Sequence, residues 1–236
     1  MRIVLASASP RRRALLTALG LEIEVVPSGA PEIDEGASPA SIVIENAKRK
    51  RDDIVGRLDS PALVIAADTL VFLDDHVLSK PRDLDDARAM LRRLSGRTHD
   101  VLTGLAVADT QRGQRVEGYE KTGVTFRKLT DTEIGHFIHA VTPLDRAGAY
   151  TVDGPGSLLV ARYDGCYQNV LGLPIVRLQQ LMRDLGHDLF EMVDGRHRGE
   201  GYSLNGIEEV RAKILEFDDR AEMIAYAFNR NKGSKP

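Results

Sequence analysis

The sequence predicts an α/β protein, and three features of the chain support this fold class. Two apolar runs, residues 3–6 and 62–67, have the length and composition of buried strands. Other segments have helical spacing, most clearly 83–94, where Leu84, Ala87 and Leu91 recur on one face. A stretch with three prolines and two glycines, 27–39, separates these elements and predicts a loop.

The composition limits the kind of protein that this chain can be. Its 236 residues suit one large or two small domains with a substantial core. A net charge of −3 argues against bulk binding to nucleic acid polymers or anionic membranes. The single cysteine, Cys166, excludes an internal disulfide and a cysteine-based zinc cluster. No apolar run approaches the roughly 20 residues of a membrane span, and the first is too short for a signal peptide, so we expect a cytoplasmic protein.

The first predicted strand leads directly into a candidate phosphate site. Ser9 is suited to cap a helix and Pro10 to occupy its first turn, so a helix is predicted from here to Gly20. The free N–H groups and the dipole of such a helix favour a phosphate, and the arginines at 11–13 add two-pronged donors. The alternative is a solvated run of charge, although three arginines oppose the helix dipole there unless an anion binds. The chain contains no Walker A loop.

Acidic and basic residues follow in two neighbouring segments. After a predicted strand at 22–26, the loop 27–39 carries Glu32, Asp34 and Glu35. These acids could hold a divalent cation beside the phosphate site or could simply face water, and the pattern leaves both open. The predicted helix 41–55 carries four consecutive bases at 48–51, and its spacing does not single out one of them.

Asp68 is the strongest candidate for a catalytic carboxylate. It follows the apolar run 62–67, which predicts a central strand that stops at Asp68. Open α/β sheets bind ligands at the carboxyl ends of their strands, although a surface acid at a strand end is the alternative. Residues 74–76 predict a hairpin turn that brings Lys80, a cation suited to phosphate, back near Asp68.

The rest of the chain continues the alternation of strands and helices. Further strands are predicted at 99–108, 115–127 and 158–163, and further helices at 131–141 and 174–185. Residues 147–156 predict a loop of small residues around a short strand. His136 and His139 lie three residues apart on one helix face and form a potential metal pair, without a third ligand nearby.

Residues 187–236 differ from the rest of the chain. Residues 196–206 are polar and predict a link, 207–229 have the spacing of a helix, and 231–236 predict a disordered end. We therefore divide the chain into a domain of residues 1–186 and a C-terminal extension of residues 187–236.

Six short motifs follow one another between residues 2 and about 185. They are Leu5-Ala6-Ser7-Ala8-Ser9-Pro10-Arg11-Arg12, Ala67-Asp68-Thr69, Lys80-Pro81-Arg82-Asp83, Leu94-Ser95-Gly96-Arg97-Thr98-His99, Ala147-Gly148-Ala149-Tyr150 and Val170-Leu171-Gly172-Leu173-Pro174. Each motif is weak alone, but in this order they are specific. By these motifs the chain resembles the Maf family, also called septum-formation-inhibitor-like proteins, and the tail from His187 lies outside the resemblance.

The resemblance implies a nucleoside triphosphate pyrophosphatase, which cleaves between the α and β phosphates to give a nucleoside monophosphate and pyrophosphate. It also implies a divalent metal cation, Mg or Mn, as cofactor and assembly as a homodimer. The implied fold has two α/β lobes around an extended mixed sheet with a central cleft, and is similar to that of the inosine triphosphate pyrophosphatases. The residues at the family's site positions are Ser7, Arg11, Arg12, Glu32, Lys50, Asp68 and Lys80.

The resemblance also assigns roles to these positions. Asp68 would accept a proton, and Glu32 would help Asp68 to hold the metal. Lys50 and Lys80, with the arginines, would neutralise charge on the phosphates, as hydrolysis between phosphates requires. Within the cleft the same residues would equally suit a non-catalytic, nucleotide-sensing regulator of septum formation, which is the alternative function.

Three positions bear on which nucleobase of the substrate the protein would prefer. The pair Arg11-Arg12 and the residue Thr69 resemble the subgroup of the family that prefers dTTP and UTP. Asp153 is neither the Gln typical of that subgroup nor the Glu typical of the subgroup that prefers 7-methyl-GTP. The preference for a base therefore stays open.

Overall fold

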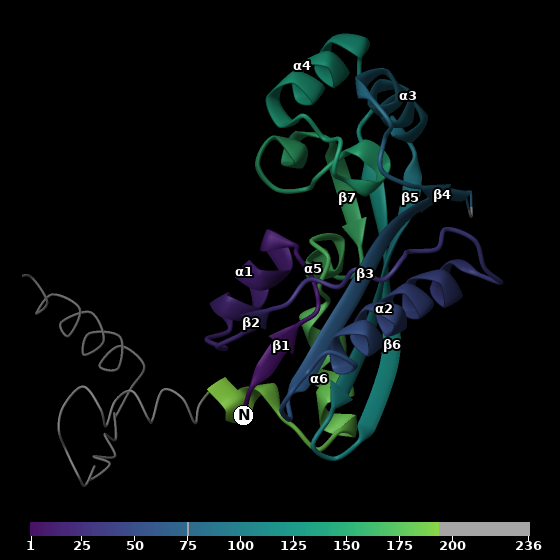
Figure 1. Cartoon of the computed structure of the whole chain (residues 1–236). Helices are drawn as coiled ribbons and strands as arrows, with labels where there is room; N and C mark the ends of the chain where they lie inside the picture. The colour runs from purple at the N-terminus through teal and green to yellow at the C-terminus, as the bar shows by residue number, and fades with distance from the viewer. Residues whose placement is uncertain (75, 194–236) are drawn as a thin grey trace, which may run out of the picture. The chain divides into compact units, whose positions relative to one another are not determined.

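The computed structural model describes residues 1–74 and 76–193, which form a mixed sheet with helices on both faces (Figure 1). The strands are β1 (Ile3–Leu5), β2 (Glu24–Val25), β3 (Leu63–Leu73), β4 (His76–Leu78), β5 (Thr98–Asp109), β6 (Gln114–Phe126) and β7 (Val160–Asp164). Their order is β2-β1-β3-β5-β6-β7, with β4 paired to β3. Because β1 runs parallel to β2 and β3 while the other pairs are antiparallel, the sheet is mixed and the predicted α/β class is confirmed.

The first four α-helices of the described residues begin after a residue whose side chain caps them, and the last two have no side-chain cap. They are α1 (Pro10–Ala18), α2 (Pro39–Val55), α3 (Leu84–Leu94), α4 (Asp131–Val141), α5 (Tyr167–Val170) and α6 (Ile175–Asp184). Ser9 accepts a hydrogen bond from Arg12 N at the start of α1, and Ser38 and Thr130 form capping boxes at α2 and α4. The short strand predicted within 147–156 is wrong, because two 3₁₀ turns, Ala147–Ala149 and Gly154–Leu158, form there instead.

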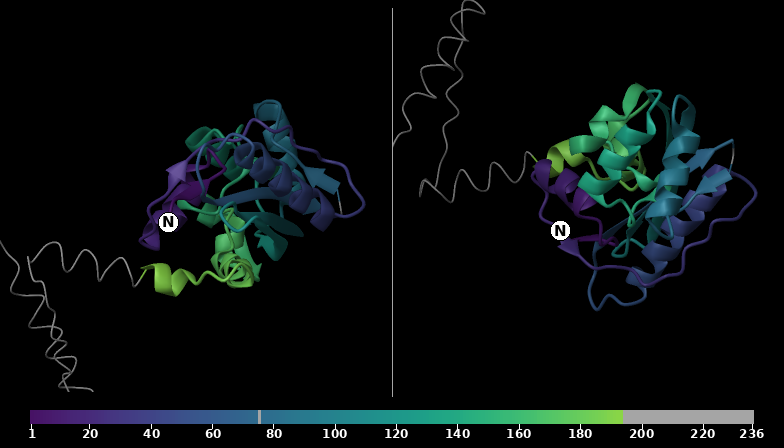
Figure 2. Two further views of the ribbon diagram at one scale, coloured as in Figure 1. Left: turned by 60° about the horizontal axis from the view of Figure 1, so that its bottom comes forward. Right: turned by 90° about the horizontal axis from the view of Figure 1, so that it is seen from above.

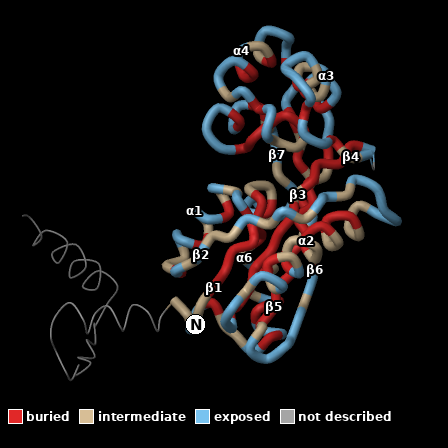
Figure 3. Tube along the Cα trace, in the orientation of Figure 1, coloured by how far each residue is buried: buried red, intermediate tan, exposed pale blue. Residues whose placement is uncertain are grey.

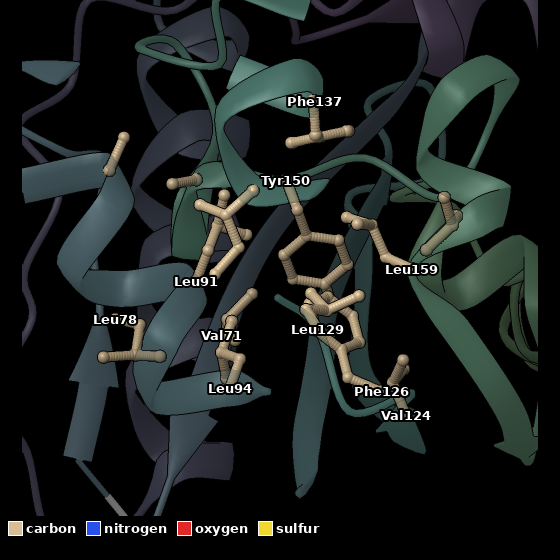
Figure 4. Packing of buried hydrophobic residues seen from close by; sticks show 14 of the residues in the cluster. Val71, Leu78, Leu91, Leu94, Val124, Phe126, Leu129, Phe137, Tyr150 and Leu159 are labelled. Carbon is tan, nitrogen blue, oxygen red and sulfur yellow. The ribbon is translucent and has the colours of Figure 1, made fainter. Parts of the chain in front are cut away.

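Three long strands, β3, β5 and β6, extend through two lobes, each with its own core. In one lobe, Ile65 and Leu105 pack with Leu16 of α1 and Leu178 of α6. In the other, the core of Figure 4 surrounds Tyr150 and includes Val71, Leu91, Leu94, Phe126 and Phe137. Figure 3 shows β3 buried along its length as it passes between these cores. The two lobes implied by the resemblance are therefore present.

Helix α2 covers one face of the sheet and α6 the other (Figures 1 and 2). Side chains of β3 alternate between these faces: Val64 packs with Ile54 of α2, whereas Leu63 packs with Leu178 of α6. Gly104 on β5 lets α2 approach closely, because a Cβ built there would lie 2.1 Å from the carbonyl oxygen of Val43. This close contact brings α2 against the middle of β3, where Asp68 is opposite Gly104.

The predicted end of the central strand at Asp68 is wrong. β3 continues to Leu73, because β5 pairs with it on both sides of the polar pair Asp68-Thr69. Along the other edge of β3, β1 pairs with residues 63–65 and β4 with residues 71–73. Within the described residues no strand pairs with 66–70 on that edge. Asp68 therefore lies beside a gap in the sheet rather than beyond a strand end, and we call this gap the open edge.

The described part of the extension packs on the lobe that contains α6. Leu189 is 6% exposed in the core with Leu178 and Leu181. His187 Nε2 lies 2.9 Å from Asp109 Oδ2, at the end of β5. The predicted link 196–206 and helix 207–229 lie outside the described residues, and the boundary at residue 186 stays a prediction. None of the helices in the described ranges is both long and apolar enough to span a membrane.

Candidate active site

Two carboxylates and one lysine form the centre of the candidate site. Lys50 Nζ lies 2.6 Å from Asp68 Oδ1 and 2.6 Å from Glu32 Oε1. Asp68 is buried, with 3% of its surface exposed, whereas the side chain of Glu32 is 45% exposed. The ammonium group therefore joins a buried carboxylate to one that faces solvent, and three predicted site residues from three segments meet at this point.

Asn46 holds this arrangement together, although the sequence analysis did not identify it. Its Nδ2 donates to Asp68 Oδ2 at 2.9 Å and to the carbonyl oxygen of Ile33 at 2.8 Å, and its Oδ1 accepts from Ile33 N at 2.8 Å. Asn46 is 1% exposed, so all these bonds are shielded from water. One side chain thus orients Asp68 and fixes the backbone next to Glu32. A signal existed: a polar residue on the otherwise apolar face of α2, four residues before Lys50.

The structure distinguishes the four consecutive bases of α2. Lys50 points to Asp68, one turn after Asn46 and two turns after Val43, which touches the sheet. Lys48 and Arg49 both pair with Glu45, and Arg51 is buried against Asp52 and Glu117. The helix period fixes the angle at which each basic side chain leaves α2. Only the packing of α2 on the sheet shows which of these side chains faces Asp68.

Arg12 is the buried arginine of the first motif. Its Nε donates to the carbonyl oxygen of Gly172 at 2.7 Å, its Nη1 to Ser7 Oγ at 2.9 Å and its Nη2 to Thr69 Oγ1 at 2.9 Å. Burial lowers the pKa of the guanidinium, and the negative charge of Asp68 opposes this shift. Arg12 stays a cation, because the delocalised guanidinium group of arginine keeps its charge in proteins. A fixed positive charge therefore lies at the start of α1, near Asp68.

A second group of charges surrounds Arg11, which is partly buried. Burial and the charge of Arg146 lower the pKa of Arg11, while Asp153 and Asp145 raise it. The carboxylate of Asp153 accepts a hydrogen bond from Thr151 Oγ1, which together with the charges of Arg11 and Arg146 keeps its pKa low. Arg146 Nε is buried without a hydrogen bond, 3.4 Å from Asp145 Oδ1. Two arginines and Asp153 therefore form one group next to the first motif.

Lys80 is placed differently from the sequence prediction, and Thr69 lies on the other face of β3 from Asp68. Lys80 follows β4 and is exposed, and within the described residues it forms no hydrogen bond or ion pair. The hairpin does direct the chain back along β3, but it does not bring the Lys80 side chain onto Asp68. Thr69 points to the opposite face of β3 from Asp68, where its hydroxyl bonds Arg12 and Thr103.

The donors at the Lys50 cluster fit a hard divalent cation. Carboxylate oxygens suit Mg²⁺ and Mn²⁺, and Mg²⁺ is commonly held by one or two carboxylates together with substrate phosphates. Glu32 and Asp68 supply such a pair. The described part of the chain contains no group of three or more His, Cys, Asp or Glu that could hold an ion, so this pair would need further oxygen ligands, such as phosphate or water. His136 and His139 are both exposed on α4 and belong to no such group.

Known proteins resemble this chain over most of its length. The family described as Maf-like protein matches residues 2–185. A dTTP/UTP pyrophosphatase of Caldicellulosiruptor bescii is 43% identical over 194 residues, which cover 80% of this chain and 98% of that protein. A second protein with this name, from Thermoanaerobacter pseudethanolicus, is 42% identical over 183 residues, covering 78% and 96%.

Among solved structures, a HAM1 protein of Coxiella burnetii is 20% identical, covers 55% of this chain and 74% of its own, and has a TM-score of 0.40. The family match extends over the strands, the helices and every residue of the candidate site described above. On that match and on the identity to its relatives, this chain belongs to the Maf-like protein family.

Proposed function

We propose that this protein is a nucleoside triphosphate pyrophosphatase that hydrolyses dTTP and UTP to the monophosphate and pyrophosphate. The observation that carries the proposal is the Lys50 bridge between Asp68 and Glu32, next to buried Arg12 at the open edge of β3. The relatives named dTTP/UTP pyrophosphatase, more than 40% identical to this chain, support the substrate class.

The triphosphate binds along the open edge in this proposal. Arg11 and Arg12 supply positive charge at the start of α1, where backbone N–H groups also favour an anion. Leu63 N donates to Arg2 O and Ala6 N donates to Ile65 O, so odd-numbered residues of β3 direct their backbone toward this edge. The N–H groups of Ala67 and Thr69 therefore face the gap and add neutral donors for the nucleotide.

Asp68 takes the proton of the attacking water. Its Oδ1 accepts from Lys50 and its Oδ2 from Asn46, and an ionised carboxylate has about four acceptor positions. Two positions therefore remain, on a carboxylate whose orientation is fixed. The water oxygen bonds to the α-phosphorus, the bond from that phosphorus to the bridging oxygen breaks, and pyrophosphate leaves with the bond's electron pair.

A divalent cation, Mg²⁺ or Mn²⁺, would be held by Glu32 and Asp68. When bound it would neutralise phosphate charge and lower the pKa of water. Lys50 contacts both carboxylates and keeps them together, so it would orient the pair. Lys80 stays a proposed phosphate ligand, since it lies exposed on the segment that returns from β4.

Base preference is the finer part of the proposal. Asp153 lies in the same charged group as Arg11, and Thr151 orients its carboxylate. This carboxylate can accept hydrogen bonds from a nucleobase. We propose that this group contacts the nucleoside. Assembly as a homodimer and location in the cytoplasm also stay proposals, and light scattering of the purified protein tests the first.

The decisive experiment is product analysis with dTTP, UTP, dCTP and 7-methyl-GTP, each with Mg²⁺ or Mn²⁺. We expect monophosphate and pyrophosphate in equal amounts from dTTP and UTP, and no turnover after the metal is removed by a chelator. Release of orthophosphate would contradict cleavage between the α and β phosphates. Tight binding of nucleotide without turnover would favour the nucleotide-sensing regulator instead.

A further inference from the structure

The hydroxyl groups behind Arg12 form a chain of hydrogen bonds with a single direction. Thr103 Oγ1 donates to the carbonyl oxygen of Asn169 at 3.0 Å, which uses its one hydrogen. Thr69 Oγ1 lies 2.9 Å from Thr103 Oγ1, so its hydrogen must point to Thr103. The oxygen of Thr69 then accepts from Arg12 Nη2 at 2.9 Å.

This series of hydrogen bonds runs inward from the partly buried Thr69 and ends on a well-anchored residue. Thr103 and Asn169 are both 0% exposed. Asn169 Nδ2 donates to the carbonyl oxygen of Val101 and to Thr122 Oγ1, both at 2.9 Å. The carbonyl group that receives the Thr103 hydrogen is therefore fixed to β5 and β6. A displacement of Thr103 would be transmitted through Thr69 to the guanidinium of Arg12.

These hydrogen bonds leave part of the Arg12 guanidinium available for a ligand. A guanidinium has five N–H donors, and three of them bond Gly172, Ser7 and Thr69. Two donors remain for a ligand. Gly172 confines the group from the other side: its φ is +104°, and a Cβ there would lie 3.4 Å from both Arg12 Nε and Thr69 Oγ1. The orientation of the two remaining donors is thus set by the buried Ser7 and Gly172 and by the partly buried Thr69.

We propose that Thr103 is a positioning residue, which acts through the hydroxyl of Thr69 to hold the remaining N–H groups of Arg12 toward a triphosphate. The hydroxyl of Thr69 then belongs to this positioning series: its hydrogen points to Thr103, and one of its two acceptor positions is taken by Arg12. This inference rests on the proposed function, since it takes the ligand of Arg12 to be a nucleoside triphosphate.

A double-mutant cycle in the full chain tests the inference. Thr103→Val removes the hydroxyl with little change of shape, and Thr103→Ser keeps it. The probe is the α,β-methylene analogue of dTTP, whose binding is measured by calorimetry without hydrolysis. We expect Thr103→Val to weaken binding and raise KM by up to about tenfold, the effect of losing one neutral buried hydrogen bond, and Thr103→Ser to stay near wild type.

Combining Thr103→Val with Arg12→Ala distinguishes a positioning role of Thr103 from an effect on folding stability alone. If Thr103 acts through Arg12, Thr103→Val changes binding less than about twofold when Arg12→Ala is already present. Thr110→Val is the matched control, because its hydroxyl bonds only the backbone of Ala62 at the far end of β3. It is expected to lower the melting temperature without changing binding. If Thr103→Val does not fold, Thr69→Val interrupts the same chain and is subject to the same cycle.

Each outcome has a distinct meaning. Equal losses from Thr103→Val with and without Arg12 would overturn the inference, as would unchanged binding by Thr103→Val. A wild type that binds the analogue and shows the expected cycle, but releases no pyrophosphate from dTTP, would overturn the proposed function and leave the positioning role standing. A wild type that does not bind the analogue would overturn both.

Discussion

The amide of Asn46 donates a hydrogen bond of 2.9 Å to the carboxylate of Asp68. The same side chain bonds both backbone groups of Ile33, next to Glu32. A single buried residue therefore fixes the relative position of the two carboxylates that are bridged by Lys50.

We predict that Asn46→Ala lowers kcat/KM for dTTP by about 10- to 100-fold, the effect of leaving buried polar partners unsatisfied. Asp68 would lose its orientation and the segment around Ile33 would loosen, so limited proteolysis within 27–38 should also accelerate. Glu45→Ala is the control, because Glu45 pairs with Lys48 and Arg49 on the outer side of the same helix. Equal effects of the two substitutions would contradict the assignment.

Asp68→Asn is expected to reduce hydrolysis by about 10²–10⁴-fold while nucleotide binding persists. The amide has nearly the same shape as the carboxylate but cannot accept the proton of water. Turnover is measured as pyrophosphate release and binding as calorimetric titration. Near-normal turnover would show that another group is the proton acceptor.

His99 is expected to make the protein sensitive to acid. It is 3% exposed, and burial lowers its pKa to about 4 from an ordinary value of 6.5. Between these values the unfolded chain binds more protons than the folded one, so the free energy of unfolding falls as pH decreases from 6.5 to 4. At pH 5 the loss from this residue is about 2 kcal/mol.

The measurement for His99 is urea unfolding at pH 7 and pH 5. His99→Phe should reduce the difference between the two pH values, even though it also removes the bond of 2.7 Å between His99 Nε2 and Tyr150 Oη. His136→Gln is the control, since His136 is exposed on α4. An unchanged pH dependence in His99→Phe would mean that other groups cause the loss in acid.

We expect the beginning of the C-terminal extension, but not its end, to contribute to the stability of the protein. A chain that ends after Val193 should unfold and hydrolyse dTTP like the full chain, because it keeps the packing of Leu189 and the contact of His187 with Asp109. A chain that ends after Leu185 loses both and should be less stable by about 2 kcal/mol or more. Urea unfolding with pyrophosphate release compares the two, and an inactive but folded chain ending after Val193 would place the later residues in the site.

Local sequence patterns determined much of this protein. The period of apolar residues predicted α2, α3, α4 and the long strands, because burial of one face requires it wherever the element lies. Ser9 and Pro10 predicted the start of α1, since capping depends on neighbours in the chain. The motifs at Arg12 and Asp68, and the family resemblance at Lys50, also identified residues that the structure brings close together.

Tertiary structure decided which side chains act together. The apolar pattern resumes at residues 70–73, but whether both apolar runs form one strand across Asp68 depends on pairing with β5, about 35 residues further along the chain. The direction in which Lys50 points, and the role of Asn46, follow from the close contact of α2 with Gly104. Arg12 and Thr69 likewise become partners only because α1 and β3 meet at the open edge. Element type is set by short-range sterics and burial, whereas these pairings need contacts between segments that the sequence keeps far apart.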